Sequence, residues 1–470
     1  MFFQHIFDKT LAQSSYLIGC QKTGESIVID PKRDVDTYLD LAKQNGLRIT
    51  HITETHIHAD FLSGSRELAA LSGATLYLSD EGGPDWQYAF EHVGLTNGDV
   101  LKVGNLTLAV LHTPGHTPES ISFLLTDKPV TSAPVMLFTG DFVFVGDVGR
   151  PDLLEKAAGL RGTQEAGAHQ LSASLQQFDA LPDYIQVWPG HGAGSACGKA
   201  LGALPSTTVG YEKIRNWAFG YKYDPEGFVS YLLADQPEPP TYFATMKKLN
   251  KVDRPLLTQV PSQKKLTAKE VKDALDKGIK LIDTRNKAAF ANGFVPGSLN
   301  IQGNNAFATW MGWFMSYEEP FMLVADESQI DELTRKLMRI GLDNVYGFID
   351  DVSTLGIELQ RANIIDIDTV KTHLERGDAQ VIDLRGAYDY KSGHIEGAEN
   401  IFVGTLPQHL DEISKEKPVV IYCQGGDRAT IGYSLLIRNG FTNVMNYSPS
   451  MNEWAGKGNA VVTEPAETVL

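Results

Sequence analysis

An internal repeat constrains the fold of this chain more than any other feature of its sequence. The repeat has two parts: Leu281–Arg285 (LIDTR) matches Val381–Arg385 (VIDLR), and Gly293–Ile301 (GFVPGSLNI) matches Gly393–Ile401 (GHIEGAENI). Both pairs are separated by the same 100 residues. Such a spacing leaves room for a whole folding unit, so the sequence predicts that two copies of one α/β domain complete the chain.

Each copy continues with an apolar, strand-like segment, 321–325 in the first copy and 419–423 in the second, followed by a loop and a helix. The second-copy helix is expected from about Arg428 to Asn439, with Gly440 after its last turn. The loop between them, Cys423–Arg428 (CQGGDR), joins the end of a strand to the start of a helix. The backbone N–H groups of such a loop and the helix N-terminus stabilise a thiolate or a bound persulfide.

This pattern resembles the rhodanese, or sulfurtransferase, domain. The resemblance implies that Cys423 is the nucleophile that accepts a sulfane sulfur and passes it on. It also implies that Arg428 holds the loop in shape or attracts an anionic donor. The persulfide-binding loop would consist of Gln424, Gly425, Gly426 and Asp427.

The first copy lacks this chemistry. Ala325 stands at the position of the cysteine, and Asp326, Glu327, Asp331 and Glu332 follow it. Four carboxylates so close to the loop would repel sulfur anions. We therefore expect the first copy to be an inactive rhodanese domain that acts as a spacer or a docking surface.

Four motifs containing histidine or aspartate mark the N-terminal half of the chain, each at the end of an apolar, strand-like run. Neutral imidazole and carboxylate are the ligands that a borderline divalent metal prefers, so motifs that meet at one sheet edge would form a metal site. The motifs are Thr55–Phe61 (THIHADF), Thr113–Thr117 (TPGHT), Phe138–Asp141 (FTGD) and Trp188–Gly192 (WPGHG).

The order of these motifs resembles the metallo-β-lactamase superfamily, whose fold is a four-layer αβ/βα sandwich. In its two-metal members a histidine follows the aspartate of H-x-H-x-D, whereas here that position is Phe61. An aromatic ring cannot ligate, so the sequence favours a single metal ion.

Resemblance to the mononuclear iron branch of this superfamily implies that one Fe(II) per chain is bound by His56, His116 and Asp141. Three further residues would orient these ligands or contact the substrate: His58, Asp60 and His191. Zinc with hydrolytic chemistry at the same ligands is an alternative, because both ions accept imidazole and carboxylate. His112 precedes the second motif, and we expect it to be a structural hydrogen-bonding group.

Two more residues are candidates for contacting the substrate. The segment that contains Arg150 resembles the G-D…G-R-x-D segment of persulfide dioxygenases, in which the arginine contacts the thiol cosubstrate. An ion pair of Arg150 with Asp147 or Asp152 is an equal alternative. Cys197 follows His191 by six residues and could line the pocket and exchange sulfur, or be a merely packed thiol.

Size and charge limit the possible partners. A chain of 470 residues suits about three domains, and a net charge of −17 disfavours nucleic acid and anionic membranes. The sequence lacks a signal peptide pattern and any apolar run near the ~20 residues of a membrane-spanning helix. Three well-separated cysteines argue for a reducing compartment. We expect a cytoplasmic protein without a nucleic-acid or membrane partner.

The expected fold class is multidomain α/β and α+β, an αβ/βα metallo-β-lactamase sandwich followed by two rhodanese-like α/β domains. A proline-rich stretch at 235–240 breaks the pattern of the first part. The expected boundaries are 1–240 for the sandwich, 241–264 for a linker, 265–358 for the inactive rhodanese-like domain and 361–466 for the active one.

The three domains in this order resemble the CstB-type family of bacterial fusions between a persulfide dioxygenase and a sulfurtransferase. The resemblance implies that O2 oxidises the persulfide of a low-molecular-weight thiol to sulfite or thiosulfate, in sulfide detoxification. It also implies a homo-oligomer, a dimer or a tetramer. The thiol, coenzyme A, glutathione or another, stays open, because the chain lacks the aromatic residue that glutathione-using relatives carry soon after the last motif histidine.

Two other functions are compatible with the sequence. One is a glyoxalase II-like zinc thioesterase fused to a rhodanese, which Phe61 disfavours because such hydrolysis uses two metals. The other is a sulfur-carrier protein whose metal domain merely binds a thiol partner. Replacing His116 would separate the carrier from the dioxygenase, because a carrier would keep all of its turnover.

Overall fold

The computed structural model describes residues 1–158, 162–199, 201–234 and 236–464. The chain divides into two compact units. The first comprises Met1–Val260 and Arg335–Gly341, and the second comprises Pro261–Thr334 and Leu342–Leu470. Within the described part of the chain, no helix has the length and apolar character needed to cross a membrane.

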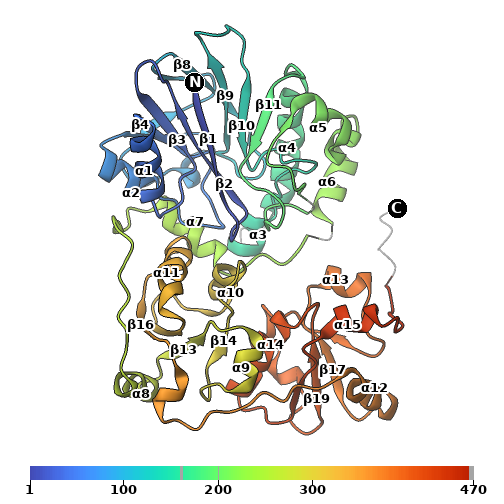
Figure 1. Cartoon of the computed structure of the whole chain (residues 1–470). Coiled ribbons are helices and arrows are strands. Elements are labelled where there is room, and N and C mark those ends of the chain that lie inside the picture. The colour runs from blue at the N-terminus through green and yellow to red at the C-terminus, as the bar shows by residue number, and fades with distance from the viewer. Residues whose placement is uncertain (159–161, 200, 235, 465–470) are drawn as a thin grey trace. The chain divides into compact units, whose positions relative to one another are not determined.

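The first unit contains two six-stranded sheets (Figure 1). In spatial order, the first sheet consists of β1 (Phe2–Asp8), β2 (Gln13–Gly19), β3 (Glu25–Ile29), β4 (Arg48–Thr53), β5 (Thr75–Ser79) and β6 (Val93–Leu95). The second consists of β12 (Thr207–Thr208), β11 (Gln186–Pro189), β10 (Met136–Gly140), β9 (Ile121–Asp127), β8 (Leu106–His112) and β7 (Val100–Val103).

Seven helices accompany these sheets in the described part of the first unit. They are α1 (Asp36–Gln44), α2 (Ser65–Ser72), α3 (Leu153–Ala158), α4 (Thr163–Asp179), α5 (Val209–Arg215), α6 (Pro225–Leu233) and α7 (Phe243–Lys251). Two short 3-10 helices, η1 (Pro84–Trp86) and η2 (Trp217–Tyr221), lie between them in the sequence.

Alternation of apolar residues makes each sheet two-sided. Along β8, Leu106, Leu108 and Val110 are buried, and they pack with Tyr16 and Ile27 of the first sheet in one core between the sheets. A second core lies beneath α1 and α2, and a third beneath α4 and α6. The order helix, sheet, sheet, helix is the predicted αβ/βα sandwich.

The end of each motif-bearing strand lies on one edge of the sandwich. Strand β4 runs parallel to β3 in one sheet, and β10 runs parallel to β11 in the other, with Gly140 opposite Pro189. Parallel neighbours bring their carboxyl ends to the same edge, so the loops that follow β4, β10 and β11 approach one another there. Strands β2 and β3 pair in antiparallel register and form a hairpin.

Helix α7 lies within residues 241–264, the segment expected to be a linker. Its residues Phe243, Met246 and Asn250 are buried in the first unit. The side-chain amide of Asn250 donates to the carbonyl oxygens of His58 and Phe61, at 2.8 Å each, and accepts from the backbone N–H of Ser63 at 2.9 Å. Helix α7 is therefore tied to the first motif loop.

The second unit contains two four-stranded parallel sheets with the same strand order (Figure 1). The first-copy sheet is β14 (Leu299–Asn300), β13 (Lys280–Asp283), β15 (Phe321–Val324) and β16 (Val345–Ile349). The second-copy sheet is β18 (Glu399–Asn400), β17 (Gln380–Asp383), β19 (Val419–Tyr422) and β20 (Val444–Asn446). This equality confirms that the repeat encodes two copies of one α/β domain.

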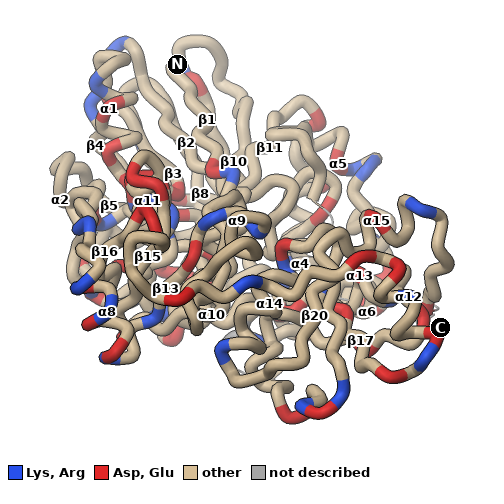
Figure 2. Tube along the Cα trace, turned by 60° about the horizontal axis from the view of Figure 1, so that its bottom comes forward, with Lys and Arg blue, Asp and Glu red and all other residues tan. Residues whose placement is uncertain are grey.

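Helices follow the strands in both copies. In the first they are α8 (Ala268–Asp276), α9 (Lys287–Asn292), α10 (Phe307–Phe314) and α11 (Ile330–Met338), with 3-10 helices η3 (Glu327–Gln329) and η4 (Val352–Leu355). In the second they are α12 (Ile367–Arg376), α13 (Ala387–Ser392), α14 (Asp427–Arg438) and α15 (Ser450–Gly456), with η5 (Leu406–Gln408) and η6 (Leu410–Glu412). Figure 2 shows acidic and basic residues interspersed along the chain in both units.

Candidate metal centre and sulfur-transfer loop

His56, His116 and Asp141 come together at the sandwich edge. Their ligand-type atoms lie within 4.8 Å of one another, and all three residues are buried. The Nε2 atoms of His56 and His116 lie 3.8 Å and 3.6 Å from Oδ2 of Asp141. Two imidazole nitrogens and one carboxylate oxygen thus face a common point.

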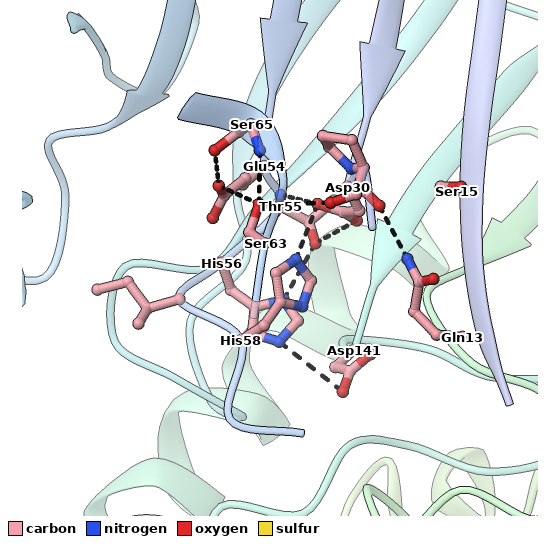
Figure 3. A network of polar contacts seen from close by, with 12 residues as sticks. Gln13, Ser15, Asp30, Glu54, Thr55, His56, His58, Ser63, Ser65 and Asp141 are labelled. Carbon is pink, nitrogen blue, oxygen red and sulfur yellow. Dashed lines mark hydrogen bonds and ion pairs between the residues drawn. The ribbon is translucent and has the colours of Figure 1, made fainter. Parts of the chain in front are cut away.

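The hydrogen bonds behind these ligands leave the right atoms free for a metal. The hydroxyl of Thr55 donates to Oδ2 of Asp30 at 2.9 Å, so its oxygen is left to accept the Nδ1–H of His56 at 3.0 Å (Figure 3). Nδ1 of His116 donates to the carbonyl of Arg150 at 2.8 Å. In each ring the Nε2 lone pair therefore points toward Asp141.

Two buried atoms of this cluster lack a hydrogen-bond partner in the described part of the chain: Nε2 of His56 and Oδ2 of Asp141. Buried polar atoms are normally satisfied, so a pair that faces a common point indicates a bound ion. The residues present fit a metal.

The charges of the site are also those of a metal centre. Burial lowers the pKa of His56 and of His116, so both imidazoles are neutral. Burial alone would raise the pKa of Asp141, but the neighbouring histidines, His191 first, hold it far below its usual range. Neutral imidazole and ionised carboxylate are the forms that ligate.

His191 connects the cluster to Asp60. Its Nδ1 is 2.7 Å from Oδ1 of Asp141, and its Nε2 is 2.7 Å from Oδ2 of Asp60. Burial would lower the pKa of His191, but the two carboxylates raise it well above its usual value, so the ring donates on both sides. His191 thereby fixes one oxygen of Asp141 and leaves the other for the metal.

His58 is directed away from the cluster. Its Nε2 lies 3.1 Å from Oδ1 of Asp30 (Figure 3). Burial opposes the charged ring, but Asp30 raises the pKa of His58 to about 9. Phe61 is fully buried and packs on the His58 ring, with ring centroids 4.3 Å apart. The aromatic residue thus occupies the position of the missing histidine and contributes no ligand.

Arg150 and Cys197 lie next to the metal-ligand cluster, and each of them has partners of its own. The guanidinium of Arg150 is buried and bound to both carboxylate oxygens of Asp152, at 2.7 Å and 2.5 Å, which is the ion-pair alternative. Its backbone N–H donates to the carbonyl of Cys197 at 3.0 Å. A direct contact of Arg150 with a substrate stays a prediction.

The thiol of Cys197 is buried and lies within 4.8 Å of ligand-type atoms of Asp60 and His191. Burial raises the pKa of this thiol well above its usual value, and Asp141 and Asp60 raise it further. A thiol in this surrounding is protonated and therefore a weak nucleophile. His112 lies outside the cluster and bonds to the carbonyl of Pro118 at 2.8 Å.

Two residues near the site escaped the sequence analysis. Glu119 is buried, and its Oε1 accepts from the backbone N–H of Ile57 at 2.8 Å and from the hydroxyl of Thr117 at 2.9 Å. It therefore joins the first motif loop to the second. Lys247 of α7 lies over the Trp86 ring, 4.0 Å from its centroid, and burial lowers the pKa of its ammonium against the charge of Glu119. Neither residue belongs to a motif that spacing could reveal.

The second site is the loop between β19 and α14. The backbone N–H of Gly426 donates to Sγ of Cys423 at 3.1 Å, and the N–H of Cys423 donates to the hydroxyl oxygen of Ser450 at 3.1 Å. Gly426 has φ +96°, and a Cβ there would lie 2.3 Å from the carbonyl oxygen of Ser448. Only glycine fits this position.

Side chains of the predicted loop brace its shape. Oε1 of Gln424 accepts from Arg385 at 3.2 Å. Arg428 pairs with Asp389 at 3.1 Å. Asp427 pairs with Lys287 of the first copy at 2.9 Å.

The equivalent loop of the first copy has different contacts. In it, Asp326 accepts from the backbone N–H and the hydroxyl of Ser328, at 2.8 Å and 2.6 Å.

Comparisons with known proteins identify a metallo-beta-lactamase part followed by two rhodanese-like parts. The profile described as "Metallo-beta-lactamase superfamily" matches residues 8–191, and "Rhodanese-like domain" matches residues 267–351 and 366–457. The crystal structure of a metallo-beta-lactamase from Staphylococcus aureus subsp. aureus COL is 44% identical, with a TM-score of 0.67, over 74% of this chain and 98% of that chain.

Curated relatives match about two-fifths of the chain. A hydroxyacylglutathione hydrolase of Nitrosococcus oceani is 37% identical over 38% of this chain and 61% of its own length. The mitochondrial persulfide dioxygenase ETHE1 of Bos taurus is 29% identical over 40% of this chain and 67% of its own length. The chain thus spans about three-fifths to two-thirds of these relatives.

Proposed function

Because this chain belongs to the metallo-beta-lactamase superfamily and carries two rhodanese-like domains, we propose that it is a persulfide dioxygenase with sulfurtransferase activity. The first unit oxidises the persulfide of a low-molecular-weight thiol with O2, and Cys423 transfers a sulfane sulfur. The observation that carries the proposal is the set of three ligands, His56, His116 and Asp141, with Phe61 in place of a further histidine.

The proposed metal is one Fe(II) per chain. Two imidazoles and one carboxylate are the set that non-haem Fe(II) oxygenases use, since it leaves positions open for two small ligands. When bound, the ion supplies the point at which the persulfide sulfur and O2 meet. His191 holds Asp141 in place from behind, and Thr55 fixes the tautomer of His56.

The overall reaction of the first unit is balanced by O2 and water. A persulfide RSSH reacts with O2 and H2O to give RSH, sulfite and two protons. The sulfur–sulfur bond breaks, the terminal sulfur loses four electrons, and O2 accepts them. The buried charges at the site, the Asp60–His191–Asp141 chain above all, are already in place before the substrate arrives, which reduces the reorganisation that the reaction requires.

Cys423 performs the second reaction. Its thiolate attacks the outer sulfur of a persulfide, the bond between the two sulfurs of the donor breaks, and the donor thiolate leaves. Sulfite then takes the sulfane sulfur from the Cys423 persulfide, which gives thiosulfate and restores the thiolate. The N–H of Gly426 donates to Sγ of Cys423 and stabilises the thiolate that attacks the donor and is restored at the end.

A zinc thioesterase is the second candidate, because the Nitrosococcus relative is named a hydroxyacylglutathione hydrolase. Hydrolysis of that kind uses two metals. Phe61 contributes no ligand here, and His58 is bound to Asp30. Both observations favour the dioxygenase.

The test compares the protein loaded with iron and with zinc. Oxygen uptake is measured on addition of coenzyme A persulfide or glutathione persulfide, and thioester hydrolysis is measured with S-lactoylglutathione. The proposal predicts uptake with iron alone, with relative rates that identify the thiol. Thioester hydrolysis by the zinc form, without oxygen uptake by the iron form, would establish the thioesterase instead.

A further inference from the structure

We propose that Lys287, in the copy without a catalytic cysteine, is a positioning residue of the Cys423 loop in the other copy. The inference rests on the sulfurtransferase part of the proposed function. Lys287 is the first residue of α9, and its ammonium donates to the carbonyl oxygen of Gly425 and to Oδ1 of Asp427, the latter at 2.9 Å. Lys287 and the Cys423 loop lie in the same compact unit.

The contact acts on the peptide group that holds the sulfur. The carbonyl of Gly425 and the N–H of Gly426 belong to one planar peptide unit and point in opposite directions. Lys287 holds the carbonyl end, while the N–H end donates to Sγ of Cys423 at 3.1 Å. Fixing one end therefore aims the other at the sulfur.

Charge strengthens this arrangement. An ammonium bound to a peptide oxygen polarises the peptide and makes its N–H a stronger donor, as in any chain of hydrogen bonds. A Cβ added to Gly426 would lie 3.2 Å from Nζ of Lys287, so the ammonium rests against the same peptide. The Lys287 side chain is 35% exposed, so solvent and salt screen its longer-range attraction to the Cys423 sulfur. The effect on the sulfur therefore comes from the hydrogen bond of Lys287 to the Gly425 carbonyl.

The repeat shows that this lysine is specific to the silent copy. The position of Lys287 in the repeat corresponds to Ala387 in the second copy, which has no ammonium to offer. The first copy thus has both features: Ala325 stands where the second copy has its cysteine, and Lys287 stands where the second copy has an alanine. The first copy is therefore a support for the active loop of its neighbour.

The experiment measures sulfur transfer from thiosulfate to cyanide by the full chain. We compare the wild type with Lys287→Met, Lys287→Arg, Cys423→Ser and a control, Lys280→Met. Lys280 is a first-copy lysine, 26% exposed, that pairs with Glu319 at 2.9 Å. Melting temperatures of all variants are recorded to separate catalysis from unfolding.

Lys287→Met is expected to lower kcat about tenfold, the effect of losing one charge-assisted hydrogen bond. We expect KM for thiosulfate and the melting temperature to be unchanged, Lys287→Arg to recover most of the rate, and Lys280→Met to behave as wild type. A Lys287→Met variant with wild-type kcat would overturn the inference alone. A rise in KM alone would also overturn it, because Lys287 would then bind the donor.

The wild type serves to separate the two claims. Sulfur transfer that Cys423→Ser removes supports the proposed function on which the inference rests. A wild type without such transfer would overturn the sulfurtransferase proposal and this inference together.

Discussion

The two rhodanese-like copies have the same scaffold and different loops. In the first, Arg285 binds Asp283 and the carbonyl of Gly293, and Asn300 donates to the carbonyls of Asp283 and Arg285. The second copy repeats each of these bonds at positions 100 residues later. The repeated sequence motifs therefore encode a hydrogen-bond network.

The two copies differ in the loop that follows the third strand, where the second copy has its cysteine. In the second copy, Gly426 turns its N–H onto Cys423. In the first, Asp326 binds its own loop through Ser328, next to Ala325. The difference teaches that the I-D-x-R pattern predicts the fold of a copy, whereas the loop determines whether that copy presents a cysteine with a backbone N–H donor.

The largest expected effect comes from the cysteine itself. Cys423→Ser should abolish sulfur transfer, because serine is no nucleophile toward sulfane sulfur under these conditions. Adding Ala325→Cys to this variant should not restore it, since the first-copy loop presents Glu327 and Ser328 where the second presents Gly425 and Gly426. Cyanide-dependent thiocyanate formation measures both. Activity of the double variant would break the comparison.

A smaller effect is expected from Gly426→Ala. The new Cβ would clash with the carbonyl of Ser448, so the 425–426 peptide must move and its N–H must leave the sulfur. We expect kcat for sulfur transfer to fall at least about tenfold. Gly440→Ala is the matched control, with φ +83° and open space around the added carbon. It should cost about 1 kcal/mol of stability from backbone strain and leave kcat unchanged.

The third expected effect is on stability rather than on rate, and it concerns the shared scaffold. Arg385 is 5% exposed and Arg285 is 26% exposed in otherwise equivalent ion pairs. Removing a partner from a buried pair leaves an uncompensated charge. Arg385→Met should lower the free energy of unfolding by about 3 kcal/mol, and Arg285→Met by about 1 kcal/mol, because water reaches the more exposed Arg285 and can hydrate Asp283 once the guanidinium is removed. Urea titrations measure both. Equal losses would show that exposure does not decide the difference.

Much of the fold could be predicted from the sequence. The repeat, the strand-like runs and the glycine-containing loops predicted the two α/β copies. Four histidine- or aspartate-containing motifs at strand ends indicated a metal site, and resemblance to the iron branch of the superfamily singled out His56, His116 and Asp141 as its ligands. Each of these features lies within a short stretch of sequence. A motif that directly follows a strand lies at the end of that strand, so the direction of the strand determines where the motif lies in the fold.

The rest depends on contacts between distant segments, which spacing does not reveal. Asn250 and Lys247 lie in a segment whose polar residues made it look like a linker, yet Asn250 bonds to the first motif loop and Lys247 lies over the Trp86 ring. Glu119 is one carboxylate among many in the sequence. Lys287 has no counterpart in the other copy, and its partner, Gly425, lies 138 residues away.

The central claim is that one chain holds two reaction centres that can be removed separately. The direct test records oxygen uptake, sulfite and thiosulfate together for wild type, His116→Ala, Cys423→Ser and the control His112→Ala, all supplied with iron and a thiol persulfide. His116→Ala should consume no oxygen and release no sulfite, and it should form thiosulfate when sulfite is added. Cys423→Ser should consume oxygen and release sulfite without thiosulfate, and His112→Ala should match wild type. Loss of oxygen uptake in Cys423→Ser, or its survival in His116→Ala, would contradict the account.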